Sequence, residues 1–356
     1  MKRLIILIDE SSKFLISTSD FKNYTSMDIE KIKVNFLAHD CSVEVCKFSD
    51  LDLSKDYKGV NIIYQTSEAP GNFYKRYIED VVYFLEKQGA HVIPKYEMLK
   101  AHHNKVYMEL LKSTFADPSL KTIKSICYGS WVDARNYNGG FPVVIKRPSS
   151  TSSTGVFLAK DKKEYNRLVK HAGHILFAQG LNEYLVGALK RTAKKVIKYF
   201  SPSKSKFMQY DTTPGSTPIV IQTFIDGLKG DYKVLVFGKK YFTLYRKTRE
   251  NDFRASGSGL HFVVPEEEHE GLLNFAQKLT LELSSPTFGM DIGFDGTNYH
   301  LFEFQMLHLG PSTLQKSLAW HEYLNGKWVR FEGKSDLEEE YSNAVSEYID
   351  KSVQKV

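Results

Sequence analysis

Residues 289–305, GMDIGFDGTNYHLFEFQ, decide the fold of this 356-residue chain. Polar side chains alternate with apolar ones in two runs, MDIGF and YHLFEFQ, which predicts a β-hairpin turning at 295–298. Oxygen atoms of Asp291, Glu303 and Gln305 cost free energy in a core unless a partner satisfies them. Glu303 and Gln305 face one side of their strand, and Asp291 reaches them across the hairpin. Such a set suits Mg²⁺ bound to phosphate. The alternative is that these residues face solvent on a half-exposed sheet.

The composition is that of an ordinary globular protein, with 42% hydrophobic and 25% charged residues. It excludes disordered and collagen-like classes, and the length allows two or three compact lobes. No apolar stretch is long enough for a signal-peptide core or a transmembrane segment, so we expect a cytoplasmic protein. Cys41, Cys46 and Cys127 lack the paired spacing of a zinc site, and we assign them no role.

The net charge of +6 suits an anionic ligand such as a nucleotide but is too mild to indicate nucleic-acid binding. Much of the excess lies in residues 190–206, where lysines and arginines alternate with apolar residues. This spacing predicts an amphipathic helix with a basic face. The face is either simply solvated or a surface for a polyanionic substrate or an anionic membrane lipid.

The order of patterns along the chain predicts three domains. Short apolar strands and helical patterns indicate an N-terminal α/β lobe at 1–100, and a linker helix with a small lobe follows at 101–225. A C-terminal lobe at 226–356 contains further strands, the hairpin and a C-terminal helix that we expect to end in the acidic run DLEEEY.

Two lysines and a small-residue loop indicate a phosphate site. Lys146 ends the apolar strand VVIK and precedes RPSSTSSTGV, whose backbone N–H groups can surround phosphate oxygens. Lys105 lies near the N-terminal turn of a predicted helix. The alternative is that RPSSTSSTGV is an ordinary surface loop.

Two further segments contain polar candidates. Gln222, in the strand IVIQTFI, either donates to and accepts from a purine edge or faces solvent in an ordinary hairpin. The block YRKTRENDFRASGSG brings Arg246 and Arg254 near other cations, which favours a bound phosphate or carboxylate. Glu250 and Asp252 offer an internal balance instead.

In their order, QTFIDGLKGDYKVLVFG, RKTRENDFRASGSG and GMDIGFDGTNYHLFEFQ resemble the ATP-grasp superfamily, and most of all its glutamate-ligase branch that modifies ribosomal-protein tails. The resemblance covers residues 100–315 and implies an α/β fold with α+β lobes, two of which sandwich ATP. The chain departs from the family pattern in the loop SSTSSTG, at Thr223, at Gln305, and in the following MLHLGPSTL. Members often self-associate, so we expect a homo-oligomer.

The resemblance also implies roles for individual residues. The residues implied to bind ATP are Lys105, Lys146, Ser152, Ser153, Gly155, Gln222, Phe224 and Asp231. Those implied to be catalytic are Arg246 and Arg254, and those implied to hold Mg²⁺, or Mn²⁺, are Asp291, Glu303 and Gln305.

The function that follows from the resemblance is an ATP-dependent carboxylate–amine ligase. Its carboxylate substrate would form an acyl phosphate that an amine then attacks, with release of ADP and phosphate. The candidates are amino acids, short peptides and uronic-acid groups of glycan precursors. Two alternatives stay open: a kinase that phosphorylates an alcohol, and a non-catalytic nucleotide-binding module.

Overall fold

The computed structural model describes residues 2–17, 24–67, 73–149, 155–174, 216–250, 252–255 and 260–353. Ser152, Ser153 and the basic segment 190–206 lie outside these ranges. The chain divides into two compact units. Unit 1 consists of Met1–His103, Leu111–Thr122 and Asp226–Val356, and unit 2 consists of Asn104–Leu110 and Ile123–Ile225.

Unit 1 begins with a four-stranded parallel sheet in the order β4-β1-β5-β6. Alternate residues of β1 enter two different cores: Leu4 and Ile6 enter one, and Ile5 and Leu7 enter the other. Burial on both faces explains why the strand is a continuous apolar run. The strands are β1 (Lys2–Ile8), β4 (Cys41–Lys47), β5 (Asn61–Tyr64) and β6 (His91–Ile93), and a hairpin of β2 (Leu15–Ser17) and β3 (Tyr24–Ser26) follows β1.

Helices cover both faces of this sheet. Helix α1 begins after Asp28, whose side chain accepts a hydrogen bond from the Lys31 backbone N–H and so caps the helix. On the other face, Ile78 and Val82 of α2 pack with Leu99 of α3. The helices are α1 (Ile29–Ala38), α2 (Phe73–Lys87) and α3 (Tyr96–His103), with a 3₁₀ turn, η1 (Phe48–Asp50), between β4 and β5.

The second sheet of unit 1 is antiparallel, with strand order β15-β14-β11-β12-β16-β17 and β13 beside β12. Its strands are β11 (Gly230–Phe237), β12 (Lys240–Lys247), β13 (His261–Phe262), β14 (Thr287–Phe294), β15 (Tyr299–Gln305), β16 (Ala319–Leu324) and β17 (Lys327–Glu332). Its helices are α9 (Glu266–Leu283), α10 (Ser312–Lys316) and α11 (Leu337–Val353). Tyr241 and Thr243 on one face of β12 hydrogen-bond to α9, through Thr280 and His269.

The acidic run 336–341 begins the C-terminal helix, so the prediction that the helix ends there is wrong. Helix α11 starts at Leu337, and its first turn contains Glu338, Glu339 and Glu340. Negative charge in the first turn is favourable, because the helix dipole places partial positive charge at that end. The C-terminal lobe therefore has a further helical segment after this run.

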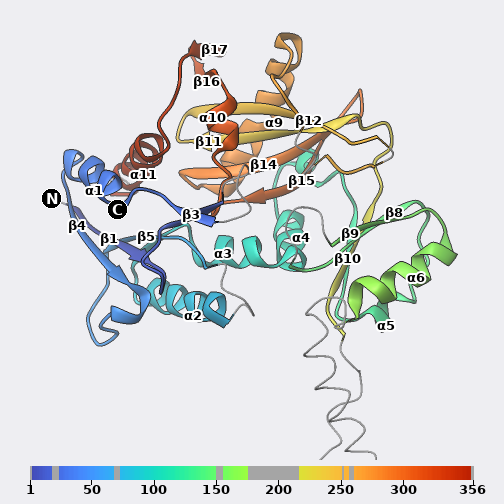
Figure 1. Ribbon diagram of the computed structural model, residues 1–356, viewed down its shortest axis with the longest axis horizontal. Coiled ribbons are helices and arrows are strands. Elements are labelled where there is room, and N and C mark those ends of the chain that lie inside the picture. Colours follow the sequence, from blue (N-terminus) through green and yellow to red (C-terminus); the bar gives the residue numbers. More distant parts are fainter. Residues whose placement is uncertain are drawn as a thin grey trace, which may run out of the picture. The chain divides into compact units, whose positions relative to one another are not determined.

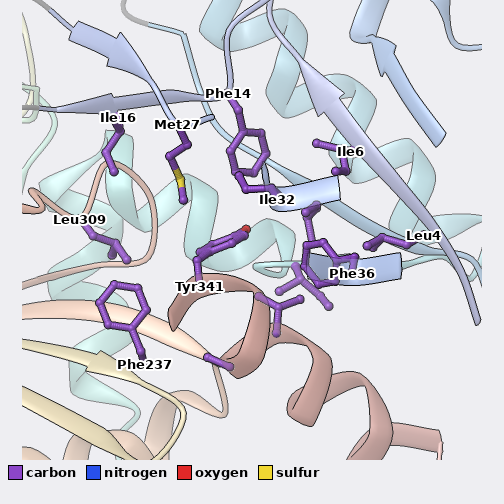
Figure 2. Close-up of a cluster of buried hydrophobic side chains, with 14 of the residues drawn as sticks. Leu4, Ile6, Phe14, Ile16, Met27, Ile32, Phe36, Phe237, Leu309 and Tyr341 are labelled. Carbon is purple, nitrogen blue, oxygen red and sulfur yellow. The ribbon is translucent and has the colours of Figure 1, made fainter. Parts of the chain in front are cut away.

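One hydrophobic core joins the first and the last parts of the chain. Figure 2 shows Tyr341 of α11 beside Phe14, with Leu309 and Phe237 on its other side. The rings of Phe14 and Tyr341 meet edge to face, with centroids 5.8 Å apart, and α11 also packs against α1 (Figure 1). Unit 1 thus combines the predicted ranges 1–100 and 226–356, and the three-domain division stays a prediction.

Unit 2 is a smaller antiparallel sheet in the order β7-β10-β8-β9. Its strands are β7 (Ser125–Tyr128), β8 (Val143–Lys146), β9 (Val156–Ala159) and β10 (Ile219–Thr223), and its helices are α5 (Trp131–Ala134) and α6 (Lys162–Gly173). Helix α4 (Lys105–Ser113) starts in unit 2 and ends in unit 1, where the 3₁₀ turn η3 (Pro118–Lys121) follows. Ile145, Ile219 and Ile221 pack on α6 through Tyr165 and Val169. Parallel and antiparallel sheets with packed helices confirm the predicted α/β class.

Candidate active site

The predicted hairpin is present, and a bulge in it brings the two predicted carboxylates opposite each other. Strand β14 ends at Phe294 and β15 begins at Tyr299. Asp295 closes the turn by accepting hydrogen bonds from the backbone N–H groups of Thr297 and Asn298, both at 2.8 Å. Asp291 lies directly opposite Glu303, with a bulge between Asp291 and Ile292. The sequence therefore predicted correctly that these two carboxylates come from paired strands.

One face of the large sheet changes from apolar to charged along its strands. On β11, Leu235 and Phe237 point into the core of unit 1, while Asp231 and Lys233 occupy the same face nearer the strand's start. Each of these two charged side chains has a charged partner on the neighbouring strand. Asp231 pairs with Arg246 of β12, and Lys233 pairs with Asp291 of β14.

Together these four side chains form a compact cluster of charges, which we call the charged cluster: Asp231, Lys233, Arg246 and Asp291. Arg246 donates two parallel hydrogen bonds to Asp231, at 2.7 and 2.8 Å. The same Nη2 nitrogen that donates to Asp231 also lies 2.9 Å from one Asp291 oxygen, and Lys233 Nζ lies 2.9 Å from the other Asp291 oxygen. Two cations and two carboxylates thus neutralise one another within the sheet face.

Burial makes this pairing energetically important. Burial alone would raise the pKa of Asp291, but Arg246 and Lys233 outweigh it and hold that pKa well below its ordinary value. The same carboxylates raise the pKa of Arg246 against the opposing effect of burial. Burial raises the pKa of Asp231, against the opposing effect of Arg246. Removing one member of the charged cluster would leave an uncompensated charge in a poorly solvated place.

Two glycines of β14 leave room for neighbouring side chains, and one of those side chains belongs to the charged cluster. Gly289 and Gly293 flank Asp291 on its own face. A Cβ at Gly289 would lie 3.4 Å from Lys233 Nζ, and one at Gly293 would lie 2.3 Å from the Phe302 ring. The run GMDIG therefore lets neighbouring side chains lie over the strand beside the carboxylate.

The residues predicted to hold Mg²⁺ lie on this same part of the sheet. Glu303 faces Asp291, and Gln305 follows two residues later, opposite Gly289. Gln305 donates from Nε2 to the backbone carbonyl of His308 at 3.3 Å. Two carboxylates and an amide are hard oxygen donors that fit Mg²⁺, which also takes oxygens from phosphate and water. In this arrangement, both oxygens of Asp291 are paired with cations.

Within the described ranges, no group of three His, Cys, Asp or Glu side chains is placed to hold a metal ion. The predicted set contains two such residues, and the third is Gln305. Metal binding there stays a prediction.

The two arginines predicted to be catalytic have different surroundings. Arg246 belongs to the charged cluster, whereas Arg254 pairs with Asp252 through hydrogen bonds of 2.9 and 2.8 Å. That pairing lowers the pKa of Asp252. The internal balance that the sequence allowed is therefore present at Arg254, whose side chain is 35% exposed against 12% for Arg246.

Unit 2 gathers a second polar group on the sheet face opposite α6. Lys146 is paired with Val220, and Gln222 is two residues further along β10, so both side chains lie on the same face. Cys127 on this face contacts the backbone carbonyl of Val106 in α4, which places that helix over it. The backbone N–H of Lys105, at the start of α4, donates to Pro148 O at 2.9 Å.

The side chain of Gln222 is held inside unit 2 by a hydrogen-bond chain. Gln222 Nε2 donates to Ser125 Oγ at 2.9 Å, and Ser125 Oγ donates to Glu109 Oε2 at 2.7 Å. Gln222 and Glu109 are 3% and 6% exposed. Lys105 and Lys146 are also buried, with 9% and 8% exposure. Buried lysines of this kind are expected where an anion binds.

The structure thus distributes the described candidates between the two units. Those in unit 2 are Lys105, Lys146, Gly155, Gln222 and Phe224, and those in unit 1 are Asp231, Arg246, Arg254, Asp291, Glu303 and Gln305. Gly155 accepts a backbone hydrogen bond from Arg147, beside the start of β9, and Phe224 directly follows β10.

Sequence reasoning missed Lys233, Glu109 and Ser125. Lys233 had a detectable signal, because a lysine two residues after an aspartate interrupts the otherwise apolar strand GDYKVLVF. Glu109 and Ser125 had none, since their roles depend on contacts between separate elements.

Comparison with known proteins supports the fold at the level of three-dimensional structure. No protein-family model and no curated protein matches the sequence. The crystal structure of D-cycloserine synthetase DcsG is similar, with a TM-score of 0.53, 11% identity, and coverage of 98% of this chain and 99% of that chain. D-alanine–D-alanine ligase from Bacillus anthracis is also similar, with a TM-score of 0.50, 14% identity, and coverage of 100% and 98%.

A third similar structure is the ADP complex of purK, N5-carboxyaminoimidazole ribonucleotide synthetase. Its TM-score is 0.50 at 10% identity, with coverage of 89% of this chain and 73% of that chain. These neighbours are ATP-grasp proteins, so the chain has the ATP-grasp fold, and the fold prediction is confirmed. The identities of 10–14% show the fold alone, and the resemblance to the glutamate-ligase branch stays a prediction.

No helix in the described part of the chain is long and apolar enough to cross a membrane. The cytoplasmic location, the homo-oligomer, the absence of a nucleic-acid partner and the lipid contact through 190–206 stay predictions.

Proposed function

We propose that this protein is an ATP-dependent ligase that joins a carboxylate to an amine and releases ADP and phosphate. The observation that supports it most is the charged cluster on the sheet face of unit 1, with Glu303 opposite Asp291. Charges that are largely shielded from water at strand positions are costly even when they are paired, and such clusters occur preferentially at functional sites. The similarity to structures named as ligases and synthetases supports the same class.

In the proposed reaction, a carboxylate oxygen attacks the γ-phosphorus of ATP, and the bond between that phosphorus and the β–γ bridging oxygen breaks as ADP leaves. The amine nitrogen then attacks the acyl carbon, the C–O bond to phosphate breaks, and the amine gives up a proton. Both steps need charge neutralisation and alignment more than a strong base, because ADP and phosphate are good leaving groups.

We assign each residue a role in this reaction according to the chemistry of its side chain. Lys105 and Lys146 bind phosphate oxygens as point charges, and Arg246 neutralises the transferring group through its planar guanidinium. Asp231 holds Arg246 in its orientation through the two parallel hydrogen bonds, so we assign it to that role in addition to the contact with ATP implied by the resemblance. Arg254 is assigned to the acyl phosphate.

Asp291, Glu303 and Gln305 would hold Mg²⁺, or Mn²⁺. When bound there, the ion would supply charge neutralisation at the nucleotide phosphates. Since Asp291 is paired with Lys233 and Arg246, these cations are placed to accompany the phosphates that the ion would bind. The acyl-phosphate intermediate and the metal are both parts of this proposal.

We propose a small-molecule carboxylate, such as an amino acid, a short peptide or a uronic-acid glycan precursor. Two similar structures are named for D-cycloserine and D-alanyl-D-alanine formation, which supports the amino-acid class first.

The test is to measure ADP and free phosphate in parallel, with purified protein, Mg-ATP and pools of carboxylates and amines. Equal amounts of ADP and phosphate that require both pools are the expected result. ADP without free phosphate would instead establish a kinase that leaves the phosphate on its substrate. Nucleotide binding without turnover in any pool would favour the non-catalytic module.

A further inference from the structure

The hydrogen bonds that hold Gln222 in unit 2 both run from donor to acceptor in one direction, and this direction affects which purine base Gln222 can bind. This hydrogen-bond chain runs from Gln222 through Ser125 to Glu109, with distances of 2.9 and 2.7 Å. Ser125 has one hydroxyl proton, which it donates to Glu109 Oε2. Its oxygen is therefore left to accept from Gln222.

This constraint fixes the side-chain amide of Gln222. One N–H of Gln222 Nε2 donates to Ser125, and the amide oxygen, bound to the same carbon, is directed away from that hydrogen bond. Because Gln222 and Glu109 are 3% and 6% exposed, water does not readily take over either partner and reverse the chain. The orientation of the Gln222 amide is thus fixed, and with it the position of the acceptor oxygen, whereas in a free glutamine the oxygen and the N–H groups could exchange places.

The hydrogen-bond chain also lies in the same part of unit 2 as the lysines proposed to bind phosphate. Lys105 is one helical turn before Glu109 on α4, so their side chains project from the same side of that helix. Lys146 shares the sheet face of Gln222, one strand away. The groups proposed for phosphate and the fixed acceptor therefore belong to one surface of unit 2.

We infer that Glu109 and Ser125 are specificity-determining residues that make Gln222 an acceptor for the 6-amino group of adenine. Adenine has a donor at this position, whereas hypoxanthine and guanine have a carbonyl acceptor there. Two facing acceptors leave buried lone pairs unsatisfied, and such mismatches discriminate more strongly than a lost apolar contact. This inference rests on the proposed function, because it assumes that a purine nucleotide is the substrate.

The probes are ATP and ITP, which differ in the chemistry of the purine 6-position and its adjoining ring nitrogen. Dissociation constants are measured by calorimetry on the full-length protein with Mg²⁺ present. We expect the parent to bind ATP about tenfold or more tightly than ITP. Purine riboside triphosphate, which has hydrogen at that position, is expected to bind with intermediate affinity.

The decisive variant is Glu109→Gln. Its amide can accept from Ser125 or donate to it, so the chain can run in either direction and Gln222 can turn its N–H groups toward the base. ITP should then bind more tightly than it binds the parent, while ATP binds less tightly, and the ATP-to-ITP ratio should approach one. A purely structural role would weaken both nucleotides together, and that result would overturn the inference.

Changes at Ser125 supply the matching controls. Ser125→Ala should relax the ratio in the same direction, because Gln222 loses its fixed partner, and Ser125→Thr should restore the parental ratio by keeping the hydroxyl. Ser130→Ala removes another serine of unit 2 that donates to a carboxylate, Asp133, at 2.6 Å. It is expected to leave the ratio unchanged.

The outcomes separate this inference from the proposed function. If the parent binds neither ATP nor ITP, the proposed function fails and the inference fails with it. If the parent binds ATP but the Glu109 and Ser125 variants keep the parental ratio, the proposed function stands and the inference alone is wrong.

Discussion

The two polar groups of this protein are built on different principles. In unit 1, the charged cluster consists of ion pairs between neighbouring strands, with Arg246 bonded to Asp231 and to Asp291. In unit 2, Gln222 is held by a chain of hydrogen bonds that runs from a sheet to a helix. The ion pairs of unit 1 neutralise one another, whereas the hydrogen bonds of unit 2 fix the orientation of the neutral Gln222 amide.

The difference determines how each group responds to a lost member. A buried charge that loses its partner keeps its desolvation cost without compensation, which is worth about 3–5 kcal/mol. A neutral hydrogen bond contributes about 1 kcal/mol, and its groups can often turn to other partners. We therefore expect variants of unit 1 to lose stability together with activity, and variants of unit 2 to change mainly affinity and selectivity.

The largest effect is expected for Asp291→Asn. This change removes the carboxylate that pairs with both Lys233 and Arg246, so two cations share one remaining aspartate. ADP formation should fall on the order of a thousandfold, and the free energy of unfolding, from urea titration, should fall by about 3 kcal/mol.

The matched control is Asp52→Asn, because Asp52 is an exposed aspartate that bonds to Ser54. It should leave both quantities near their parental values. Near-parental turnover in Asp291→Asn would remove this carboxylate from the proposed metal site.

Lys233→Met is expected to separate metal binding from nucleotide binding. It keeps the apolar stem but removes the cation beside Asp291, so the cluster becomes more negative. Mn²⁺ should bind more tightly in the absence of nucleotide, as followed by electron paramagnetic resonance, while ATP binds about tenfold more weakly. The free energy of unfolding should fall by about 1–3 kcal/mol, because Asp291 keeps Arg246.

Lys240→Met is the control on the same sheet, since Lys240 pairs with Glu340 at 2.8 Å away from the cluster. It should not change Mn²⁺ binding. A Lys233 variant with unaltered Mn²⁺ and ATP affinities would show that the pair with Asp291 serves the fold rather than the site.

The fold and the hairpin part of the site could be predicted from the sequence, because the patterns that indicate them are local. The alternation around Asp291 and Glu303 specified the strands, and 295–298 specified the turn. The bulge that brings Asp291 opposite Glu303 was not predicted. The sequence analysis wrongly placed the acidic run at 336–341 at the end of the C-terminal helix, although such a run is typical of a helix start.

The rest of the site depends on contacts that no local pattern records. Ser125 and Gln222 are 97 residues apart, and their hydrogen bond exists because β7 and β10 are neighbours in the small sheet. Glu109 joins them from a helix. Each of these residues is unremarkable in its own segment, and their joint role is a property of the packed unit.

Lys146→Met tests whether the second region acts mainly on affinity. Lys146 ends β8 and is 8% exposed, and its replacement removes a proposed phosphate contact while keeping most of the apolar stem. ATP should bind about tenfold more weakly, with Mn²⁺ binding in the absence of nucleotide unchanged. If Mn²⁺ binding changed as expected for Lys233→Met, the proposal that unit 1 binds the metal and unit 2 acts mainly on nucleotide affinity would be wrong.

The smallest effect is expected at the hairpin turn, because solvent screens the charge of Asp295 there. Hydrogen bonds from His300 and from the backbone N–H groups of Asn298 and Thr297 lower the pKa of Asp295 to about 2. A carboxylate with a lowered pKa stabilises the fold above its unfolded pKa of about 4, and the contribution disappears as the pH falls toward 2. Asp295→Asn should therefore lower the melting temperature by about 1–2 °C at pH 6, with the difference shrinking below pH 4. Asp226→Asn, at an exposed turn beside Gly227, is the control, and an Asp295 difference that stayed constant down to pH 2 would show that shape rather than charge holds this turn.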